Sequence, residues 1–295
     1  KTMTPAIVIT DGNAGANYAV TLDTSANGTI TQAPVTVAFT ADNKVYDTND
    51  SATILSRTVT GHIAPDLMIT ATGGIATFNN KNVGNGKAVS ASGFSLDNAN
   101  YFVNSVTATT ANITPKSLAV TASASDKMYD GTNTATVVYF DNRLGADDFT
   151  VSGTAVFTNK HAANNKTVNV TGITLSGTDA GNYTPNSTTS DTADINVRPI
   201  TVTAQTNTKV YDGFTSSVAT PAISVNTIAT GDTAVFSQTY DNKNVGTGKT
   251  LTPAGSVTDG NAGANYDINF DDVSTGVITA KALTVSATGV NKVYD

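Results

Sequence analysis

The sequence predicts an all-β protein built as a tandem array of modules of about 83 residues. Two motifs carry the period: the tyrosines of Lys-x-Tyr-Asp follow one another at steps of 83, 82 and 83 residues, and those of Asn-Tyr do the same. The motifs are Lys44–Asp47, Lys127–Asp130, Lys209–Asp212 and Lys292–Asp295, and Asn17–Tyr18, Asn100–Tyr101, Asn182–Tyr183 and Asn265–Tyr266. Two markers that share one period indicate tandem copies of one structural unit.

Composition supports the all-β assignment. The 295 residues include 53 threonines, all 23 acidic residues are aspartate, and glutamate, cysteine and tryptophan are absent. Threonine and valine favour half-buried strands, and Asn, Asp and Gly favour turns. The usual helix-forming residues are scarce, so the chain has little to build helices from.

The period sets the module boundaries. Residues 1–31 read as the C-terminal half of a repeat, 32–115, 116–198 and 199–281 as three full modules, and 282–295 as the start of a further repeat. The junctions between them are two to four residues long and contain proline at Thr114-Pro115-Lys116 and Arg198-Pro199. Such short linkers leave little freedom, so we expect a semi-rigid rod cut from a longer repetitive protein.

Each module is predicted to be an Ig-like β-sandwich of six or seven short strands. The opening strand alternates apolar and polar residues, as at Val35, Val37 and Phe39, which places the apolar side chains on one face. Leu283, Val285 and Ala287 repeat the pattern, and Ile30 falls on a predicted closing strand. The Asn/Gly clusters predict tight turns with positive φ; they are 80–87, 159–166 and 242–249. The alternative is a β-grasp-like module with one short helix.

Charge and composition argue against several classes of binding partner. A net charge of −7 argues against nucleic acid and anionic membranes, because both attract basic patches. No run of 18 apolar residues occurs, so no membrane contact is expected within this segment. The absence of cysteine excludes disulfides and thiol chemistry, and it fits a secreted bacterial protein.

Around its motifs the chain resembles the YDG/MBG-type repeat domains of large bacterial surface adhesins. The resemblance rests on Tyr129-Asp130-Gly131-Thr132, on the Asn-Lys-Asn-Val-Gly segment after Phe78 and on Gly-Asn-Tyr, in one frame along the whole chain. Many such adhesins are similar to filamentous haemagglutinins exported by two-partner secretion. The resemblance implies stalk or filament modules outside the cell and brings no catalytic residues. The first copy departs from the motif, with Thr48 where Gly131 and Gly213 follow the aspartate.

The repeated motif admits two interpretations. Its tyrosine could form a glycan-binding platform, but a corner tyrosine bonded to the backbone fits its recurrence in every module better. The aspartate is expected to cap the turn. The lysine either forms an ordinary ion pair with that aspartate or, as in some adhesin stalks, an isopeptide bond, for which Lys127, Asn182 and Asp130 would be the set.

Metal and catalytic sites are weakly supported. Asp11-Gly12-Asn13-Ala14-Gly15 has the appearance of a calcium loop, but no glutamate can supply a late bidentate ligand, so an Asx-rich turn is favoured. His62 and His161 lack metal-ligand spacing, and the pairs Asp147–Asp148 and Asp271–Asp272 are expected to be solvated loop charges. We therefore expect no enzyme, metal or cofactor.

The sequence thus predicts the structural stalk or filament region of a secreted or cell-surface bacterial adhesin, with a role in cell adhesion and biofilms. The partners expected are neighbouring repeats and other copies of the chain. A multivalent array that binds a surface glycan or protein is the alternative.

Overall fold

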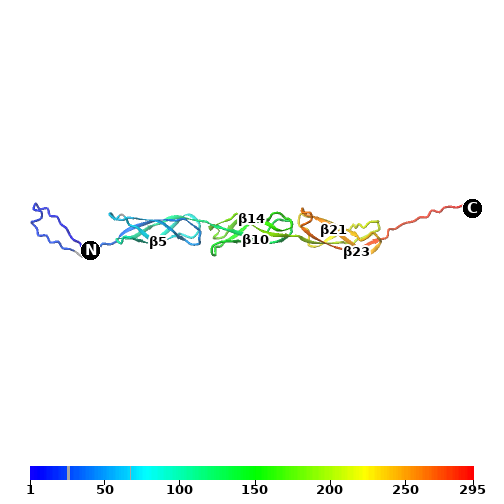
Figure 1. Ribbon diagram of the computed structural model, residues 1–295, viewed down its shortest axis with the longest axis horizontal. Helices are drawn as coiled ribbons and strands as arrows, with labels where there is room; N and C mark the ends of the chain where they lie inside the picture. Colours follow the sequence, from blue (N-terminus) through cyan, green and yellow to red (C-terminus); the bar gives the residue numbers. More distant parts are fainter. Residues whose placement is uncertain (25–26, 67) are drawn as a thin grey trace. The chain divides into compact units, whose positions relative to one another are not determined.

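The computed structural model describes residues 1–24, 27–66 and 68–295, which divide into two compact units. Unit 1 comprises Lys1–Ser117, Arg143–Phe149 and Gly177–Thr184, and unit 2 comprises Leu118–Asn142, Thr150–Ser176 and Pro185–Asp295. Both are built of β-strands (Figure 1). Within the described part of the chain the only helical turn is the 3-10 helix η1 (Ala180–Asn182), and no helix is long and apolar enough to cross a membrane. The all-β prediction is confirmed.

Unit 1 contains two sheets, with strand orders β4-β1-β7 and β2-β8-β6-β5-β3. Its strands are β1 (Ala33–Ala41), β2 (Lys44–Val45), β3 (Ser51–Ala52), β4 (Ile54–Thr60), β5 (Ala71–Phe78), β6 (Gly84–Leu96), β7 (Tyr101–Thr107) and β8 (Thr109–Thr114). The sheets pack on a core that includes Val35, Val37 and Val59 from the first sheet and Phe94 and Leu96 from the second. Two sheets around one core make a β-sandwich.

Unit 2 repeats this arrangement twice. Its sheets have the orders β10-β12 and β11-β16-β14-β13, then β19-β17-β22 and β18-β23-β21-β20. The strands are β10 (Val120–Ala124), β11 (Lys127–Met128), β12 (Val137–Asp141), β13 (Thr150–Phe157), β14 (Ala163–Ser176), β16 (Thr188–Asn196), β17 (Arg198–Thr203), β18 (Thr208–Val210), β19 (Ala222–Val225), β20 (Thr233–Tyr240), β21 (Gly246–Thr258), β22 (Tyr266–Asp271) and β23 (Val273–Thr279). Two short strands, β9 (Lys116–Leu118) and β15 (Tyr183–Pro185), have residues in both units.

Parallel pairing puts the two sequence motifs at opposite ends of a sandwich. In unit 1 the opening strand β1 runs parallel to β7, with its first residue, Ala33, opposite Tyr101 of the Asn-Tyr motif. The Lys-x-Tyr-Asp strand β2 runs parallel to β8, with Lys44 opposite Ile113 near the end of that strand. In unit 2 the pairs β17–β22 and β18–β23 are also parallel. One motif therefore marks where the sandwich begins and the other where it ends.

The predicted alternation is confirmed on the opening strands of the complete sandwiches. Val35, Val37 and Phe39 are 2%, 0% and 5% exposed, and the Phe39 ring lies 6.1 Å from that of Phe94. The same pattern was wrong for Leu283 and Val285, which are 86% and 82% exposed in a stretch without strands, and the closing strand at Ile30 is also absent. A strand with one apolar face is stable when a second sheet covers that face. No sheet in the described part of the chain covers these two segments.

Two predictions about local structure have different outcomes. The Asn/Gly clusters do turn through positive φ, at Gly86 (59°), Asn165 (51°) and Gly248 (67°). The expectation of short strands was wrong for β6, β14 and β21, which are 13, 14 and 13 residues long. Gly93 and Gly172 take positive φ inside β6 and β14, so these strands bend and continue where a turn was expected.

Candidate interaction site at the module junctions

A buried carboxylate joins two tyrosines in unit 1. The Tyr46 hydroxyl donates to the Asp147 carboxylate at 2.9 and 3.1 Å, and the Tyr183 hydroxyl donates to Asp147 Oδ2 at 2.6 Å. Tyr46 is 1%, Tyr183 5% and Asp147 8% exposed. We call Tyr46, Asp147 and Tyr183 joint A. Joint A links one Lys-x-Tyr-Asp motif to a loop 101 residues further along the chain.

Backbone hydrogen bonds hold each member of joint A in place. The Tyr46 amide donates to the Thr114 carbonyl at 2.9 Å, at the end of β8. The Tyr183 hydroxyl accepts from the Leu144 amide at 2.9 Å, and the Asp147 amide donates to the Leu144 carbonyl at 3.3 Å. The aspartate is thus presented by a tight turn whose first residue is bonded to the Asn-Tyr tyrosine.

Three further contacts surround the carboxylate. Lys81, in the Asn-Lys-Asn-Val loop, reaches Asp147 at 3.3 Å and Asp179 at 3.6 Å. The amide of Val83, in the same loop, donates to Asn182 Oδ1 at 2.9 Å. The Tyr46 and Tyr183 rings meet edge to face at 5.5 Å and 73°. Two loops that close one sandwich therefore both contact the loops that open the next.

Unit 2 holds the same arrangement, which we call joint B: Tyr129, Asp232 and Tyr266. The Tyr129 hydroxyl donates to Asp232 at 3.0 Å and the Tyr266 hydroxyl at 2.7 Å, with the rings 5.5 Å apart at 76°. Lys160 Nζ lies 3.5 Å from the Asp232 carboxylate. The Ala162 amide donates to Asn265 Oδ1 at 2.8 Å. The Ala229 amide donates to the Tyr266 hydroxyl at 2.8 Å. The Tyr-Asp-Tyr centre, the lysine beside the carboxylate and the amide-to-Asn bond of joint A thus recur here, whereas the Lys81–Asp179 contact belongs to joint A.

The electrostatics of joint A favour a charged aspartate between neutral tyrosines. Burial alone would raise the pKa of Asp147, but hydrogen bonds from Tyr183 and Tyr46 and the nearby Lys81 hold that pKa below its ordinary value. Burial, together with the adjacent Asp147 charge, raises the pKa of Tyr183 to about 12. Burial likewise raises the pKa of Tyr266 in joint B. The hydroxyls therefore stay protonated and donate to the carboxylate at neutral pH.

Comparison with known families matches this repeated architecture. A model of the YDG domain matches three times in tandem, over residues 31–110, 114–190 and 196–275. The chain belongs to the YDG domain family. No curated protein matches it. The YDG-type repeat inferred from the motifs is confirmed, and joints A and B connect the first YDG domain to the second and the second to the third.

The glycine of the YDG motif serves its backbone conformation. Gly131 and Gly213 have φ of 83° and 88°, and Thr48 in the first YDG domain has φ of 73°. The motif therefore needs a left-handed residue even where glycine is absent, and a β-branched residue there is strained. The aspartate caps this turn as predicted, since Asp130 Oδ1 accepts from the Thr132 amide at 2.8 Å.

The lysine of the motif closes its own turn. Lys127 Nζ donates to Asp130 at 2.8 Å and to the carbonyls of Thr132 and Thr134 at 3.0 and 3.1 Å. Asn182 instead accepts from Val83 N, as described for joint A. These partners argue against the isopeptide hypothesis for Lys127 and Asn182 and favour the ordinary ion pair, extended by backbone bonds.

The calcium-like loop at 11–15 recurs letter for letter at 259–263 in the third YDG domain, and both copies are Asx-rich turns. Asp259 Oδ1 accepts from the amides of Asn261 and Gly263, and Oδ2 accepts from the amide of Asn265. Asp11 likewise accepts from Asn13 and Gly15 amides. Among the described residues, no group of three His, Cys, Asp or Glu is placed to hold a metal ion. Both carboxylate oxygens of Asp259 are thus hydrogen-bonded within the turn that presents Asn265-Tyr266.

Sequence reasoning missed the centre of the joints. Asp147 was expected to be a solvated loop charge, but it is buried and accepts from two tyrosines; Asp271 and Asp272 are exposed, as expected. The period could not reveal this role, because Asp147 and Asp232 are 85 residues apart in loops of different length. The lysines do keep a recurring position, since Lys81 and Lys160 both follow an asparagine in the predicted turn.

Proposed function

We propose that this array of YDG domains is the structural stalk of a secreted or cell-surface bacterial adhesin, with no enzymatic activity. In this role it projects adhesive elements away from the cell, as part of cell adhesion and biofilm formation. The observation that carries the proposal is the recurrence of one buried joint, in joints A and B, between successive domains. A stalk needs successive domains held in a defined orientation, and a buried joint adds to the restriction that the short linkers already impose.

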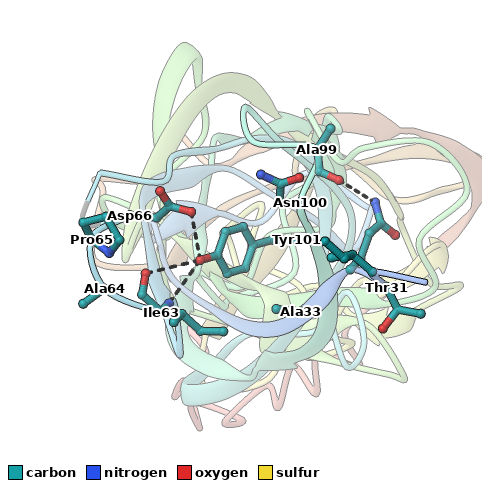
Figure 2. Close-up of a pocket in the computed structure, with 11 residues that line it drawn as sticks. Thr31, Ala33, Ile63, Ala64, Pro65, Asp66, Ala99, Asn100 and Tyr101 are labelled. Atoms are coloured by element: carbon teal, nitrogen blue, oxygen red, sulfur yellow. Dashed lines mark hydrogen bonds between the residues drawn. The ribbon is translucent and has the colours of Figure 1, made fainter. Parts of the chain in front are cut away.

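The burial of the motif tyrosines in the three YDG domains also supports a stalk over a glycan-binding array. Glycan platforms use exposed aromatic rings, whereas Tyr46, Tyr129, Tyr101, Tyr183 and Tyr266 are 0–7% exposed. Tyr46, Tyr129, Tyr183 and Tyr266 are therefore buried in contacts between domains, and Tyr101 is buried within its own domain (Figure 2). Their partners are neighbouring repeats, and the acidic chain offers no basic patch to nucleic acid or to a membrane surface.

Small-angle scattering of the full chain tests the proposal. We compare the wild type with a double variant, Tyr46→Phe with Tyr129→Phe, that removes the hydroxyl from both joints. The stalk predicts a defined, extended distance distribution for the wild type that becomes broader in the variant. A wild type as flexible as the variant would contradict it, and saturable binding to a glycan array without any effect of the variant would favour the binding array instead.

A further inference from the structure

A lysine and an asparagine meet at the Asn/Gly turn of every YDG domain. In each domain the lysine Nζ donates to the asparagine Oδ1 at 2.6 Å, across seven positions of the chain; the pairs are Lys87 with Asn80, Lys166 with Asn159, and Lys249 with Asn242. We call these the turn pairs. They differ from the lysines of Lys-x-Tyr-Asp, and they bring an amine against a carboxamide three times in the chain.

The third domain adds a carboxylate to its turn pair. Asp241 Oδ1 lies 2.9 Å from Lys249 Nζ, and Asn242 Nδ2 donates to Asp241 Oδ2 at 3.3 Å. One carboxylate therefore contacts both the amine and the carboxamide nitrogen. The corresponding residues of the first and second domains are Asn79 and Thr158, which cannot take up and release a proton as a carboxylate does.

The amine of the third turn pair is largely withdrawn from water. Lys249 is 7% exposed, and burial disfavours the charged form of a lysine. The effect is visible in the second domain, where burial lowers the pKa of Lys166. In the third domain the hydrogen bond from Lys249 holds the pKa of Asp241 below its ordinary value. Asp241 is thus a carboxylate that is placed to accept a proton from the lysine.

The carboxamide of Asn242 is polarised for attack. Its Oδ1 accepts from the Asn244 amide at 3.0 Å in addition to Lys249 Nζ. Fixed donors on a carbonyl oxygen stabilise the negative charge that develops there when a nucleophile adds to the carbon. Reacting atoms about 3–3.5 Å apart are in position to react. The Lys249 nitrogen already contacts the oxygen bonded to the carbon that it would attack.

We propose that Lys249 and Asn242 join in an isopeptide bond, with Asp241 as the catalytic residue. Asp241 takes a proton from Nζ, and the neutral amine attacks Asn242 Cγ. The carboxyl passes this proton to Nδ2, the Cγ–Nδ2 bond breaks, and ammonia leaves. The second proton on Nζ returns to Asp241 and then to the ammonia. One ammonium ion is released for each new amide bond, and no oxidant or cofactor is consumed.

The bond would close the turn at 242–249 covalently. This turn corresponds to the loops that contribute Lys81 and Lys160 to joints A and B. A covalent closure restricts the unfolded chain more than a hydrogen bond does, because it persists when the strands separate. The inference goes beyond the stalk role, since a stalk can be held together by hydrogen bonds alone.

Mass spectrometry of the denatured full chain tests the proposal. The wild type is expected to be lighter than its sequence by one ammonia. Trypsin should not cut after Lys249, because the acylated side chain is no longer a cationic lysine, but it should cut after Lys87 and Lys166. Fragment spectra should place the link between residues 242 and 249. The position matters, because a succinimide at Asn85-Gly86 would also release ammonia.

Two conservative substitutions should abolish the bond. Lys249→Arg keeps the positive charge but lacks the amine, and Asp241→Asn reproduces the Asn-Asn sequence of the first domain. Both variants should have the mass of their sequences.

The converse substitution, Asn79→Asp, should produce a second loss of ammonia in the first domain. It places a carboxylate beside Asn80 and Lys87. The backbone there is already in the required position, since the Asn79 amide donates to the Ala88 carbonyl at 3.0 Å, as that of Asp241 does to the Thr250 carbonyl at 2.9 Å.

Three results would overturn the proposal. The first is a wild type that keeps the mass of its sequence after prolonged incubation. The second is a loss of ammonia that maps to a succinimide and persists in Lys249→Arg. The third is a link between Lys249 and Asn242 that forms equally well in Asp241→Asn, because the carboxylate would then have no catalytic role.

Discussion

Joints A and B surround their central carboxylate with different residues. In joint A, Lys81 bridges Asp147 and Asp179, and Phe149 packs on Tyr183 beneath Arg143, which lies 3.8 Å from the centre of the Phe149 ring. In joint B, Arg198 donates to the Tyr129 carbonyl at 3.3 Å, and Gly131 lies beside the loop that carries Asp232. The surroundings differ, but the Tyr-Asp-Tyr centre and the Asn acceptor do not.

The comparison shows which parts of a joint tolerate exchange. Buried polar groups must each find a partner, so replacing one member of the centre leaves the others unsatisfied. The outer contacts are apolar packing and partly exposed charges, which several residue types can supply. Stability should therefore depend steeply on the centre and weakly on its surroundings.

The largest effect is expected from removing the carboxylate. Asp147→Ala or Asp232→Ala leaves two buried hydroxyls and a lysine without their acceptor, which should cost about 3 kcal/mol of unfolding free energy. Asp66→Ala in the first YDG domain should cost below about 1 kcal/mol, because Asp66 is half-buried and, among the described residues, accepts from the single tyrosine Tyr101. Urea unfolding followed by tyrosine fluorescence measures all three, and equal losses would contradict the account.

The second-largest expected effect is a loss of stability at alkaline pH, where the tyrosines of the joints ionise. Because the pKa of Tyr183 is raised to about 12 in the folded protein, its stabilisation is fully present below pH 10 and is lost as the pH rises through 12. The loss should be on the order of 2 kcal/mol. At the acid end the lowered pKa of Asp147 means that stability falls as the pH drops below 3.8. Tyrosinate absorbance and melting temperature against pH check both; tyrosines that all titrate near 10 would be evidence against buried joints.

Removing single hydroxyls distinguishes the tyrosines of joints A and B from Tyr211, the motif tyrosine of the third YDG domain. Tyr46→Phe and Tyr129→Phe each lose a hydrogen bond to a charged group and should destabilise by about 1.5–2 kcal/mol. Tyr211→Phe should change stability by less than about 0.5 kcal/mol in dilute solution, since its hydroxyl has no partner within the described chain. Urea unfolding curves of the three variants, measured side by side, give these free energies. A loss of stability in Tyr211→Phe as large as in Tyr46→Phe and Tyr129→Phe would contradict the prediction.

The motif glycines give a matched pair. Alanine at Gly131 or Gly213 is strained by positive φ, at a cost of about 1 kcal/mol. At Gly131 the added Cβ would also lie 3.0 Å from the Thr230 carbonyl oxygen, whereas at Gly213 it meets nothing within 4 Å. Gly131→Ala should therefore lower the melting temperature more than Gly213→Ala. Equal decreases in melting temperature would show that the turn at Gly131 is not in close contact with the loop of joint B.

The smallest expected effect is an increase in stability on substitution of Thr48. Thr48 occupies the left-handed position of the first YDG motif at φ 73°. Thr48→Gly relieves a strained β-branched residue and should stabilise the first domain by about 0.5–1 kcal/mol, after allowing for the greater freedom of glycine when unfolded. Differential scanning calorimetry would detect the shift, and a lower melting temperature would rule out strain at Thr48.

The sequence was informative for several properties that repeat in register, although the repeated pattern at Leu283, Val285 and Ile30 wrongly predicted strands. The period located the modules' motifs, the alternation at Val35, Val37 and Phe39 located a buried face, and the aspartate of the motif caps its turn as predicted. No role was predicted for Asp66 and Asp232, and Asp147 was wrongly predicted to be solvated, because the three lie in loops whose lengths vary, with spacings of 81 and then 85 residues. A contact between a motif and a loop about 100 residues later depends on packing of two domains, which no local pattern encodes.

A double-mutant cycle at joint B tests the central claim most directly. Tyr129→Phe, Asp232→Asn and the double variant are compared with the wild type by urea unfolding, with Tyr211→Phe and Asp66→Asn as the matched unpaired cycle. If the motif tyrosine of one domain binds the aspartate of the next, the joint B pair should couple by at least about 1 kcal/mol and the unpaired cycle by nearly none. Additive losses at joint B would contradict the account, because Tyr129 and Asp232 would then stabilise the chain independently.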